Sequence, residues 1–279
     1  MSLVLNDLSS IAMLVLVVTG LMMIFGLLGI VNLAHTGLMT IGVYIAISIR
    51  QHGGNFVLAA IGGTIAAGII GAVIEVLIIR RLYGRPLDSI LATWGVSLVI
   101  IEAITLSYGP GLQNMSLPIH GGVTIFGATF ATYPLVLVVV AIALLAGLVA
   151  IAVGTRAGKV VRMVLDNPEL ARTNGINTGR VRQLAFVVGS ALAGLAGALL
   201  GPTQAVQPNY ASGILVVGFL AVLLAGRSLA GLLIACIVLG TVQTVFTLHI
   251  DPTYATIAVI VLGALILRVR PNGFELKAI

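Results

Sequence analysis

The sequence predicts an all-α membrane protein, a polytopic bundle of eight or nine transmembrane helices. Hydrophobic residues make up 59% of the 279 residues and charged residues only 8%, whereas a water-soluble domain typically has about 25% charged residues. Several apolar runs reach or approach the roughly 20 residues that cross about 30 Å of hydrocarbon as a helix. No stretch alternates apolar and polar residues as the strands of a membrane barrel do.

The apolar runs define nine candidate spans, whose ends are set only to within several residues. They are residues 11–31, 33–49, 56–79, 89–107, 134–153, 184–201, 214–226, 229–248 and 254–267. Three of them, 33–49, 214–226 and 254–267, are short enough to be tilted, half-crossing or re-entrant, so eight spans are the alternative. The first run follows MSLVLNDLSS, which has no basic residue and no small-residue cleavage site after it. We therefore expect a permanent span there and not a removable signal peptide.

Basic residues are confined to connections on one side of this predicted bundle. Thirteen of the fourteen Lys and Arg residues fall in connections that the positive-inside rule assigns to the cytoplasm, and Arg50 is the exception. The opposing segments 107–133 and 201–213 contain no Lys, Arg, Asp or Glu. This pattern places the amino terminus outside and the carboxyl terminus inside, and it explains the basic composition without a nucleic-acid partner. The thirteen are Arg80, Arg81, Arg85, the six between Arg156 and Arg182, Arg227, Arg268, Arg270 and Lys277.

Residues 154–182 are predicted to form a folded cytoplasmic loop. The loop holds six basic and two acidic residues, and its net charge of +4 exceeds what orienting a neighbouring helix requires. Val160 to Leu165 can form a turn or two of helix, and Asp166-Asn167-Pro168-Glu169 is typical of a helix stop followed by a helix cap. A second short helix from Pro168 to Thr173 then ends at Asn174-Gly175, where glycine permits a left-handed cap. A soluble motor subunit could bind a surface helix of this kind. The alternative is a solvated loop whose basic residues only set the topology.

Two stretches resemble the branched-chain amino acid permease family of ABC importers. RAGKVVRMVLDNPELARTNGINTGRVRQLAFVVGSALAGLAGALLG is similar to the family's cytoplasmic loop and following helix, with basic residues, then Asp-Asn-Pro-Glu, Ala-Arg, and Gly-Ile-Asn before Arg-Val. GLLGIVNLAHTGLMTIGVYIA resembles the family's Asn-x-Ala-His-Gly stretch, although Thr36 precedes Gly37 where glycine usually follows the histidine directly. In length, order and hydropathy the similarity covers nearly the whole chain, and it is not specific to one substrate.

The resemblance implies that residues 1–279 form a single transmembrane permease domain in a bacterial inner membrane, in contact with its lipid, for branched-chain or other amino acids. It also implies three kinds of partner: a related permease in a heterodimer, two ATP-binding subunits, and a periplasmic or surface solute-binding protein. The loop residues then expected to contact the ATPase are Arg156, Arg162, Asp166, Asn167, Pro168, Glu169, Arg172, Gly175 and Asn177.

The chain lacks a usable phosphate loop. Around Gly158-Lys159, Val153 stands where the first glycine belongs and Val160 where Ser or Thr would bind magnesium. We therefore expect no cofactor in this chain, with ATP and magnesium held by the partner subunits, and no metal site. No catalytic constellation is present in the sequence, so an enzyme is not expected.

Two polar breaks in the apolar runs are candidates for the translocation path. FGLLGIVNLAHTGLMTIGVYIAI and ALLGPTQAVQPNYASGILVVGFLAV both contain a Gly-rich helix end, a polar break and a resumed apolar run. On the predicted topology they have opposite orientations, as in an inverted repeat whose discontinuous helices meet at a transport site; chance similarity and simple capping of broken helices are the alternatives. The candidate residues are Asn32, His35, Gln204, Gln207, Asn209 and Tyr210, with Glu102 from another span.

Two carboxylates lie inside predicted spans, where a buried ionisable group costs roughly 2.5 kcal/mol or more unless it has a cavity, a partner or a proton. Glu75 is followed within two turns by Arg80 and Arg81, so a structural role near the interface is expected. Glu102 has no cation nearby in sequence, and it either faces the path or pairs with another helix. A stand-alone secondary transporter or channel would need these two residues as a relay, and a urea or short-amide ABC permease is the other alternative.

Small residues recur every four positions on two of the predicted spans. Gly189, Ala193, Gly197 and Gly201 form one stripe, and Gly63, Ala67 and Gly71 form another. Stripes of this kind let neighbouring membrane helices approach closely. We expect them to be helix contacts and not substrate contacts.

Overall fold

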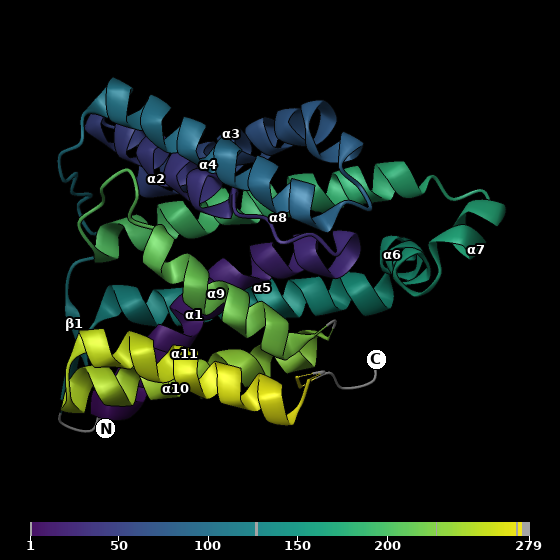
Figure 1. The fold of residues 1–279 in the computed structure, drawn as a ribbon. Coiled ribbons are helices and arrows are strands. Elements are labelled where there is room, and N and C mark those ends of the chain that lie inside the picture. Colours follow the sequence, from purple (N-terminus) through teal and green to yellow (C-terminus); the bar gives the residue numbers. More distant parts are fainter. Residues whose placement is uncertain (1, 126–127, 227, 272, 275–279) are drawn as a thin grey trace. The chain divides into compact units, whose positions relative to one another are not determined.

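The structure is a computed structural model that describes residues 2–125, 128–226, 228–271 and 273–274 (Figure 1). These residues are mostly helical, which confirms the predicted polytopic helical bundle. The helices are α1 (Ser2–Leu28), α2 (His35–Gln51), α3 (Phe56–Leu77), η1 (Ile79–Arg81), α4 (Pro86–Tyr108), α5 (Thr132–Gly154), α6 (Arg156–Asp166), α7 (Pro168–Thr173), α8 (Thr178–Leu200), η2 (Gly201–Thr203), α9 (Ser212–Ala225), α10 (Leu229–His249) and α11 (Pro252–Val269), where η marks a 3-10 turn.

In the described part of the chain, seven helices are long and apolar enough to cross a membrane: α1, α3 with η1, α4, α5, α8 with η2, α10 and α11. The chain is therefore a multi-pass membrane protein. Two of the runs predicted to be short spans are indeed short, because α2 has 17 residues and α9 has 14. At 1.5 Å per residue these helices measure about 26 and 21 Å, less than the hydrocarbon thickness. The cations Arg227 and Lys277, used above to predict topology, lie outside the described residues.

Contacts divide the chain into two compact units, which are described separately. One draws on residues 1–18, 116–144 and 213–278, and the other on residues 19–115 and 145–212. Helices α1 and α5 contribute one end to each unit. The second unit contains all of residues 154–182, the predicted docking loop, and the residues of both polar breaks up to Ser212 at the start of α9.

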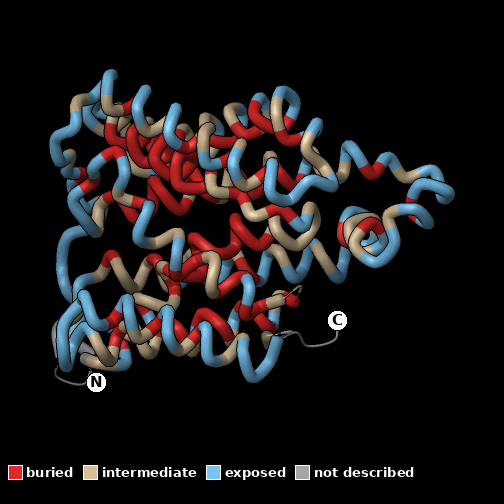
Figure 2. The backbone as a smooth tube through the Cα atoms, in the orientation of Figure 1, coloured by how far each residue is buried: buried red, intermediate tan, exposed pale blue. Residues whose placement is uncertain are grey.

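The core of the second unit is the packing of α2, α3 and α8 against one another at glycines (Figures 1 and 2). A methyl group on Gly42 would overlap the backbone of Gly194, one on Gly63 would overlap the carbonyl of Gly42, and one on Gly194 would overlap the carbonyl of Gly63. The three backbones therefore touch directly. This is the arrangement that small residues permit in membrane helices, where lipid supplies no hydrophobic drive for association.

The two predicted glycine stripes are confirmed as helix contacts. On α3, Gly63 meets α2, and Gly71 meets the Ser190 side chain of α8. On α8, Gly189 packs against Gly20 and Ile24 of α1, and Gly197 lies on the carbonyl of Met39 in α2. The α8 stripe thus faces α1 and α2.

The first unit pairs α10 with α11 and adds the start of α1. Gly240 of α10 lies against Ile11 of α1. The next residue of α10, Thr241, donates its hydroxyl at 3.1 Å to the carboxylate of Asp7, which is one turn before Ile11. The bond ties the first turns of α1, which precede the apolar run predicted as a span, to α10.

A two-stranded antiparallel sheet, β1 (Gly122–Ile125) and β2 (Ala128–Ala131), also belongs to the first unit. Gly122 is opposite Ala131, and Ile125 is opposite Ala128. The all-helical prediction missed this hairpin. Its signal is the pair of short alternating runs Val-Thr-Ile and Ala-Thr-Phe, which are typical of strands.

Candidate translocation path and docking loop

The first polar break separates α1 from α2. Gly29 adopts a left-handed conformation (φ 63°) just after α1 ends, which glycine does without strain. The Asn32 side-chain oxygen then accepts from the Ala34 amide at 3.1 Å, and the Leu33 amide donates to the Thr93 hydroxyl of α4 at 3.1 Å. The break is therefore held by side chains that replace lost helical hydrogen bonds, as irregular backbone at membrane depth requires.

A row of hydroxyl side chains runs along α2 from this break. Thr36, Thr40 and Tyr44 are four residues apart and all are buried, so they share one helix face. The Thr36 hydroxyl lies 2.7 Å from the Ser97 hydroxyl of α4. Sequence reasoning missed these residues, although Ser89, Thr93 and Ser97 repeat the same spacing on α4.

The second polar break reaches back to this face of α2. After η2, Val206 pairs with Gln113 through two backbone hydrogen bonds of 2.7 and 2.8 Å. The Thr40 hydroxyl then lies 3.1 Å from the buried Pro208 carbonyl and 2.9 Å from the Thr36 carbonyl of its own helix, so its one hydrogen is shared between these two acceptors. Thr40 is the sixth of the 17 residues of α2, so the loop contacts that helix less than two turns from its start. Thr36 and Thr40 thus connect the first break, α4 and the second break within one unit.

Several polar atoms around these breaks are buried without a hydrogen-bond partner among the described residues. They are the Asn32 amide nitrogen and the hydroxyl oxygens of Tyr44, Ser190 and Tyr210. Leaving a buried polar atom unsatisfied costs about 1–3 kcal/mol, so such groups are typical of a surface that meets water or a polar solute. His35 is fully buried beside them and packs its imidazole against Gly20.

The structure does not bring all predicted path residues together. Asn32, His35 and Tyr210 lie at the hydroxyl face or its breaks, whereas Gln204, Gln207 and Asn209 are exposed on the connection between η2 and α9. Glu102 lies on the exposed face of α4, which also carries Trp94, Leu98 and Leu106. No ion pair joins Glu102 to another described residue.

Glu75 is bound as the sequence predicted, but more deeply. Its carboxylate is fully buried (0% exposed), accepts from Arg80 at 3.1 and 3.4 Å, and accepts from the Tyr83 hydroxyl at 2.8 Å. Burial, followed by the hydrogen bond to Glu75 and the charge of that carboxylate, raises the pKa of Tyr83 above its usual value. The Tyr83 hydroxyl therefore stays protonated and acts as the donor.

The docking loop is folded, and its predicted helices are confirmed. Thr155 caps α6 by accepting from the Gly158 amide at 3.1 Å, and α6 begins at Arg156, earlier than the predicted Val160. Asn167 caps α7 by accepting from the amides of Glu169 and Leu170 at 3.1 and 3.0 Å, with Pro168 in the first turn.

The end of the loop is equally ordered by local hydrogen bonds. Gly175 is left-handed (φ 78°) after α7, as predicted for a helix stop. The Arg172 guanidinium donates to the Thr178 hydroxyl at 3.0 Å, and Asn177 caps α8 by accepting from the Arg180 amide at 3.0 Å. At the other end, Arg162 donates to the Ala152 carbonyl at 2.7 Å and holds α6 against the end of α5.

The loop presents a mixed apolar and charged surface. Met163 and Leu170 are 39% and 55% exposed although both are apolar. A shallow pocket between α6 and α7 is lined by Lys159, Arg162, Met163, Asp166, Asn167 and Leu170. An exposed apolar patch ringed by charge is typical of a protein-binding surface.

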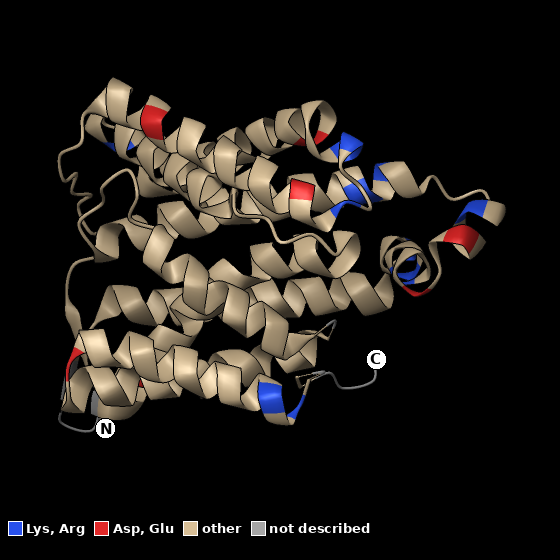
Figure 3. Cartoon of the chain, in the orientation of Figure 1, with Lys and Arg blue, Asp and Glu red and all other residues tan. Residues whose placement is uncertain are grey.

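Charged side chains gather at one end of the second unit (Figure 3). Arg80 and Arg81 lie in η1 after α3, and Arg85 precedes α4. Arg182 lies in the first turns of α8, with its guanidinium 5.3 Å from the centre of the Tyr83 ring. Arg50 is not in this group. It lies in the last turn of α2, where it donates to the Gly54 carbonyl at 3.1 Å. The backbone pair Gln113–Val206 joins the two segments that the sequence placed together on the uncharged side.

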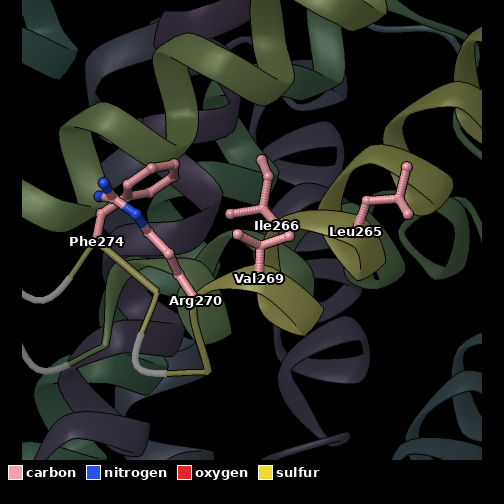
Figure 4. Close-up of a pocket in the computed structure, with 5 residues that line it drawn as sticks. All are labelled: Leu265, Ile266, Val269, Arg270 and Phe274. Carbon is pink, nitrogen blue, oxygen red and sulfur yellow. The ribbon is translucent and has the colours of Figure 1, made fainter.

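Another pocket lies in the first unit at the end of α11 (Figure 4). Phe274 and Arg270 lie at one end of it and Leu265 at the other, with Ile266 and Val269 between them. The Phe274 amide donates to the Leu224 carbonyl at 2.6 Å, which ties this segment to α9. Four of the five lining residues are apolar, and Arg270 supplies the charged group.

Comparison with known proteins places the chain in a family. Residues 3–269 match the family model described as branched-chain amino acid transport system / permease component. High-affinity branched-chain amino acid transport system permease protein LivH of Salmonella typhimurium is 28% identical over 92% of this chain and 89% of the relative. The corresponding protein BraD of Pseudomonas aeruginosa is 27% identical over 92% and 90%. A probable LivH of Methanocaldococcus jannaschii is 26% identical over 88% and 80%.

Among solved structures, a chain of PsaBC from Streptococcus pneumoniae in complex with Fab superposes with a TM-score of 0.50 at 15% identity, covering 96% of this chain and 91% of that one. This likeness concerns the fold. Since the family model spans nearly all of the chain, the protein belongs to the family of permease components of branched-chain amino acid transport systems.

Proposed function

We propose that the chain is the membrane-spanning subunit of an ATP-driven ABC importer in a bacterial inner membrane, and that it carries branched-chain amino acids, or another small amino acid, inward. The observation that supports this most is the hydroxyl face of α2. It links two broken-helix segments through Thr36–Ser97 and Thr40–Pro208 and leaves polar atoms buried around it. Discontinuous helices that meet inside a bundle are where transporters bind solutes.

The path works by alternating access. Freed backbone groups and side chains at the breaks, including Asn32, His35 and Tyr210, orient the solute's charged ends, while the surrounding apolar residues accept its side chain. Since the breaks are irregular backbone on packed helices, a small displacement of α2 or α8 moves the solute contacts of both breaks together. A solute site of this kind opens to one side at a time.

The driving force enters through the docking loop, residues 154–182. Two ATP-binding subunits hold ATP and magnesium and grip the exposed surface of α6 and α7, where Met163 and Leu170 lie among Lys159, Arg162 and Asp166. A related permease completes the membrane pair, and a periplasmic or surface binding protein delivers the solute. The contact residues proposed in the loop are those predicted from the sequence.

In the proposed topology the chain crosses the membrane nine times, because α2 and α9 are short crossings in addition to the seven long helices. The amino terminus is then outside, and the two broken segments are an inverted repeat within a single permease domain. The contact of the second break with the buried Thr40 of α2, through the Pro208 carbonyl, supports this arrangement.

The proposed function is tested by purifying the chain with its candidate partners. We expect it to copurify with ATP-binding subunits and, in proteoliposomes with binding protein outside and ATP inside, to accumulate labelled leucine. Leucine uptake by this chain alone would contradict the proposal and favour a secondary transporter or channel. ATP-dependent uptake of urea or acetamide with no uptake of leucine or other amino acids would contradict the amino-acid assignment.

A further inference from the structure

The carboxylate of Glu75 organises a cluster at the charged end of the second unit. Glu75 is fully buried at the end of α3 and accepts hydrogen bonds from two donors on the connection to α4, Arg80 at 3.1 Å and Tyr83 at 2.8 Å. A buried carboxylate with a bidentate arginine and a phenol has little freedom, because moving it would strip a charge of its partners. The Tyr83 ring is thereby fixed to the end of α3.

The Tyr83 ring also contacts α8, through Arg182. The Arg182 guanidinium carbon lies 5.3 Å from the ring centre, within the range of a cation–π contact. The Arg182 Nε atom is buried and has no hydrogen-bond partner among the described residues. The guanidinium of Arg182 instead contacts the face of the Tyr83 ring. Arginine is the better of the two basic residues for such stacking.

Arg182 is the last residue of the docking loop and lies one turn into α8, away from the exposed surface of α6 and α7. The loop ends where Arg172 of α7 donates to the Thr178 hydroxyl at 3.0 Å, and Thr178 is the first residue of α8. Thr178 and Arg182 are four residues apart and therefore lie on the same face of the helix. A continuous line of contacts runs from α7 through Thr178 and Arg182 to Tyr83 and Glu75.

The alternative route from the loop into the bundle is the covalent one along α8. That route acts on α3 only through the packing of the two helices at Gly63 and Gly194, which lies farther into the bundle. The Tyr83 contact joins the two helices at the end nearest the loop. It is well placed to keep them in register when the loop is displaced.

We propose that Tyr83 and Arg182, held by Glu75, are positioning residues that transmit movement of the docking loop to α3 and α4 and so couple ATP hydrolysis to solute movement. This inference rests on the proposed function. It assigns the coupling role to residues outside the docking surface, at a junction that the sequence did not reveal.

The test uses the complete transporter in proteoliposomes and measures the number of leucine molecules taken up per ATP hydrolysed. Arg182→Gln is expected to keep the complex and its ATPase activity but to lower this ratio about three- to ten-fold, the size expected from losing a partly desolvated cation–π contact. Arg182→Lys, which keeps the cation, restores part of the ratio. Arg180→Gln is the matched control two residues earlier on the exposed side, and it leaves the ratio unchanged.

Tyr83→Phe tests the other half of the contact. It keeps the ring for Arg182 but removes the hydroxyl that binds Glu75, and we expect a similar loss of ratio. In the double variant the losses should not multiply, since both changes interrupt one route. Multiplied losses, or an unchanged ratio in Arg182→Gln, would contradict the inference alone, while wild-type transporter without ATP-dependent leucine uptake would contradict the proposed function and this inference with it.

Discussion

At the scale of single residues, the polar contacts inside the second unit are few and specific. Thr40 connects α2 to the second break, and Glu75 is the only fully buried carboxylate among the described residues. In a membrane such groups have no water to exchange with, so a lost partner is not replaced. Each contact can therefore be tested by removing one atom.

Thr40→Val removes the hydroxyl that holds Pro208 and keeps the shape of the side chain. We expect a loss of about 0.5–1.5 kcal/mol in unfolding free energy, together with weaker leucine uptake because the second break is no longer anchored. Thermal unfolding in detergent and uptake in proteoliposomes measure the two effects. Thr64→Val is the matched control, since Thr64 binds only the Ala60 carbonyl of its own helix. Equal effects of both changes would contradict a specific role for Thr40.

Glu75→Ala leaves Arg80 and Tyr83 without their acceptor. Because Arg80 is half exposed, part of the loss is compensated by solvent, and we expect a destabilisation of about 1–3 kcal/mol, below the value for a wholly buried pair. Asp88→Ala, which breaks the exposed pair of Asp88 with Arg85 at 3.9 Å, should change stability little. A thermal shift that is the same for both variants would show that the Glu75 cluster is not structural.

At the scale of elements, the helices of the docking loop follow from local signals. Asn167, Pro168 and Gly175 act within their own turn, so their roles could be predicted from the sequence alone. The faces of the membrane helices could not be predicted in this way. α4 carries hydroxyl side chains on one face and a carboxylate on another, and nothing local shows that Ser97 is on the buried side and Glu102 on the exposed side.

Asn167→Ala removes the cap of α7 and should cost about 1 kcal/mol of local stability. We expect the bundle to unfold at an unchanged temperature, because α7 lies outside it, while uptake per ATP falls. Asn167→Asp, which preserves the cap, serves as the control. Should Asn167→Ala transport leucine with normal coupling, the loop would not be the docking element.

Gly194→Ala tests the contact of α3 with α8. The added methyl group would overlap the Gly63 carbonyl and the Ala67 side chain, and separating the helices should cost about 1–3 kcal/mol. Gly95→Ala on α4 is a matched change in open space, where alanine is the better helix former. Thermal unfolding of the two variants compares them directly, and equal stability would contradict direct backbone contact.

At the scale of the whole molecule, composition and charge predicted a multi-pass helical protein with one folded basic loop. The contacts that define the candidate path could not be predicted, because they join residues far apart in the chain. Thr36 meets Ser97 across 61 residues, and Thr40 meets Pro208 across 168. Periodicity identifies which residues share a face but not which face they meet.

The central claim is that the basic loop faces the cytoplasm and is gripped there by ATP-binding subunits. The chain has one cysteine, Cys236, which is buried, so a Cys236→Ala background allows single cysteines to be placed at Glu169 in the loop and at Asn209 on the predicted outer side. The measurement is labelling by a membrane-impermeant maleimide in spheroplasts and in inside-out vesicles. The predicted result is that the Asn209 position reacts only in spheroplasts, and that the Glu169 position reacts only in inside-out vesicles and is protected when the ATP-binding subunits are present. Labelling of the Glu169 position from outside, or labelling that the subunits do not change, would contradict the account.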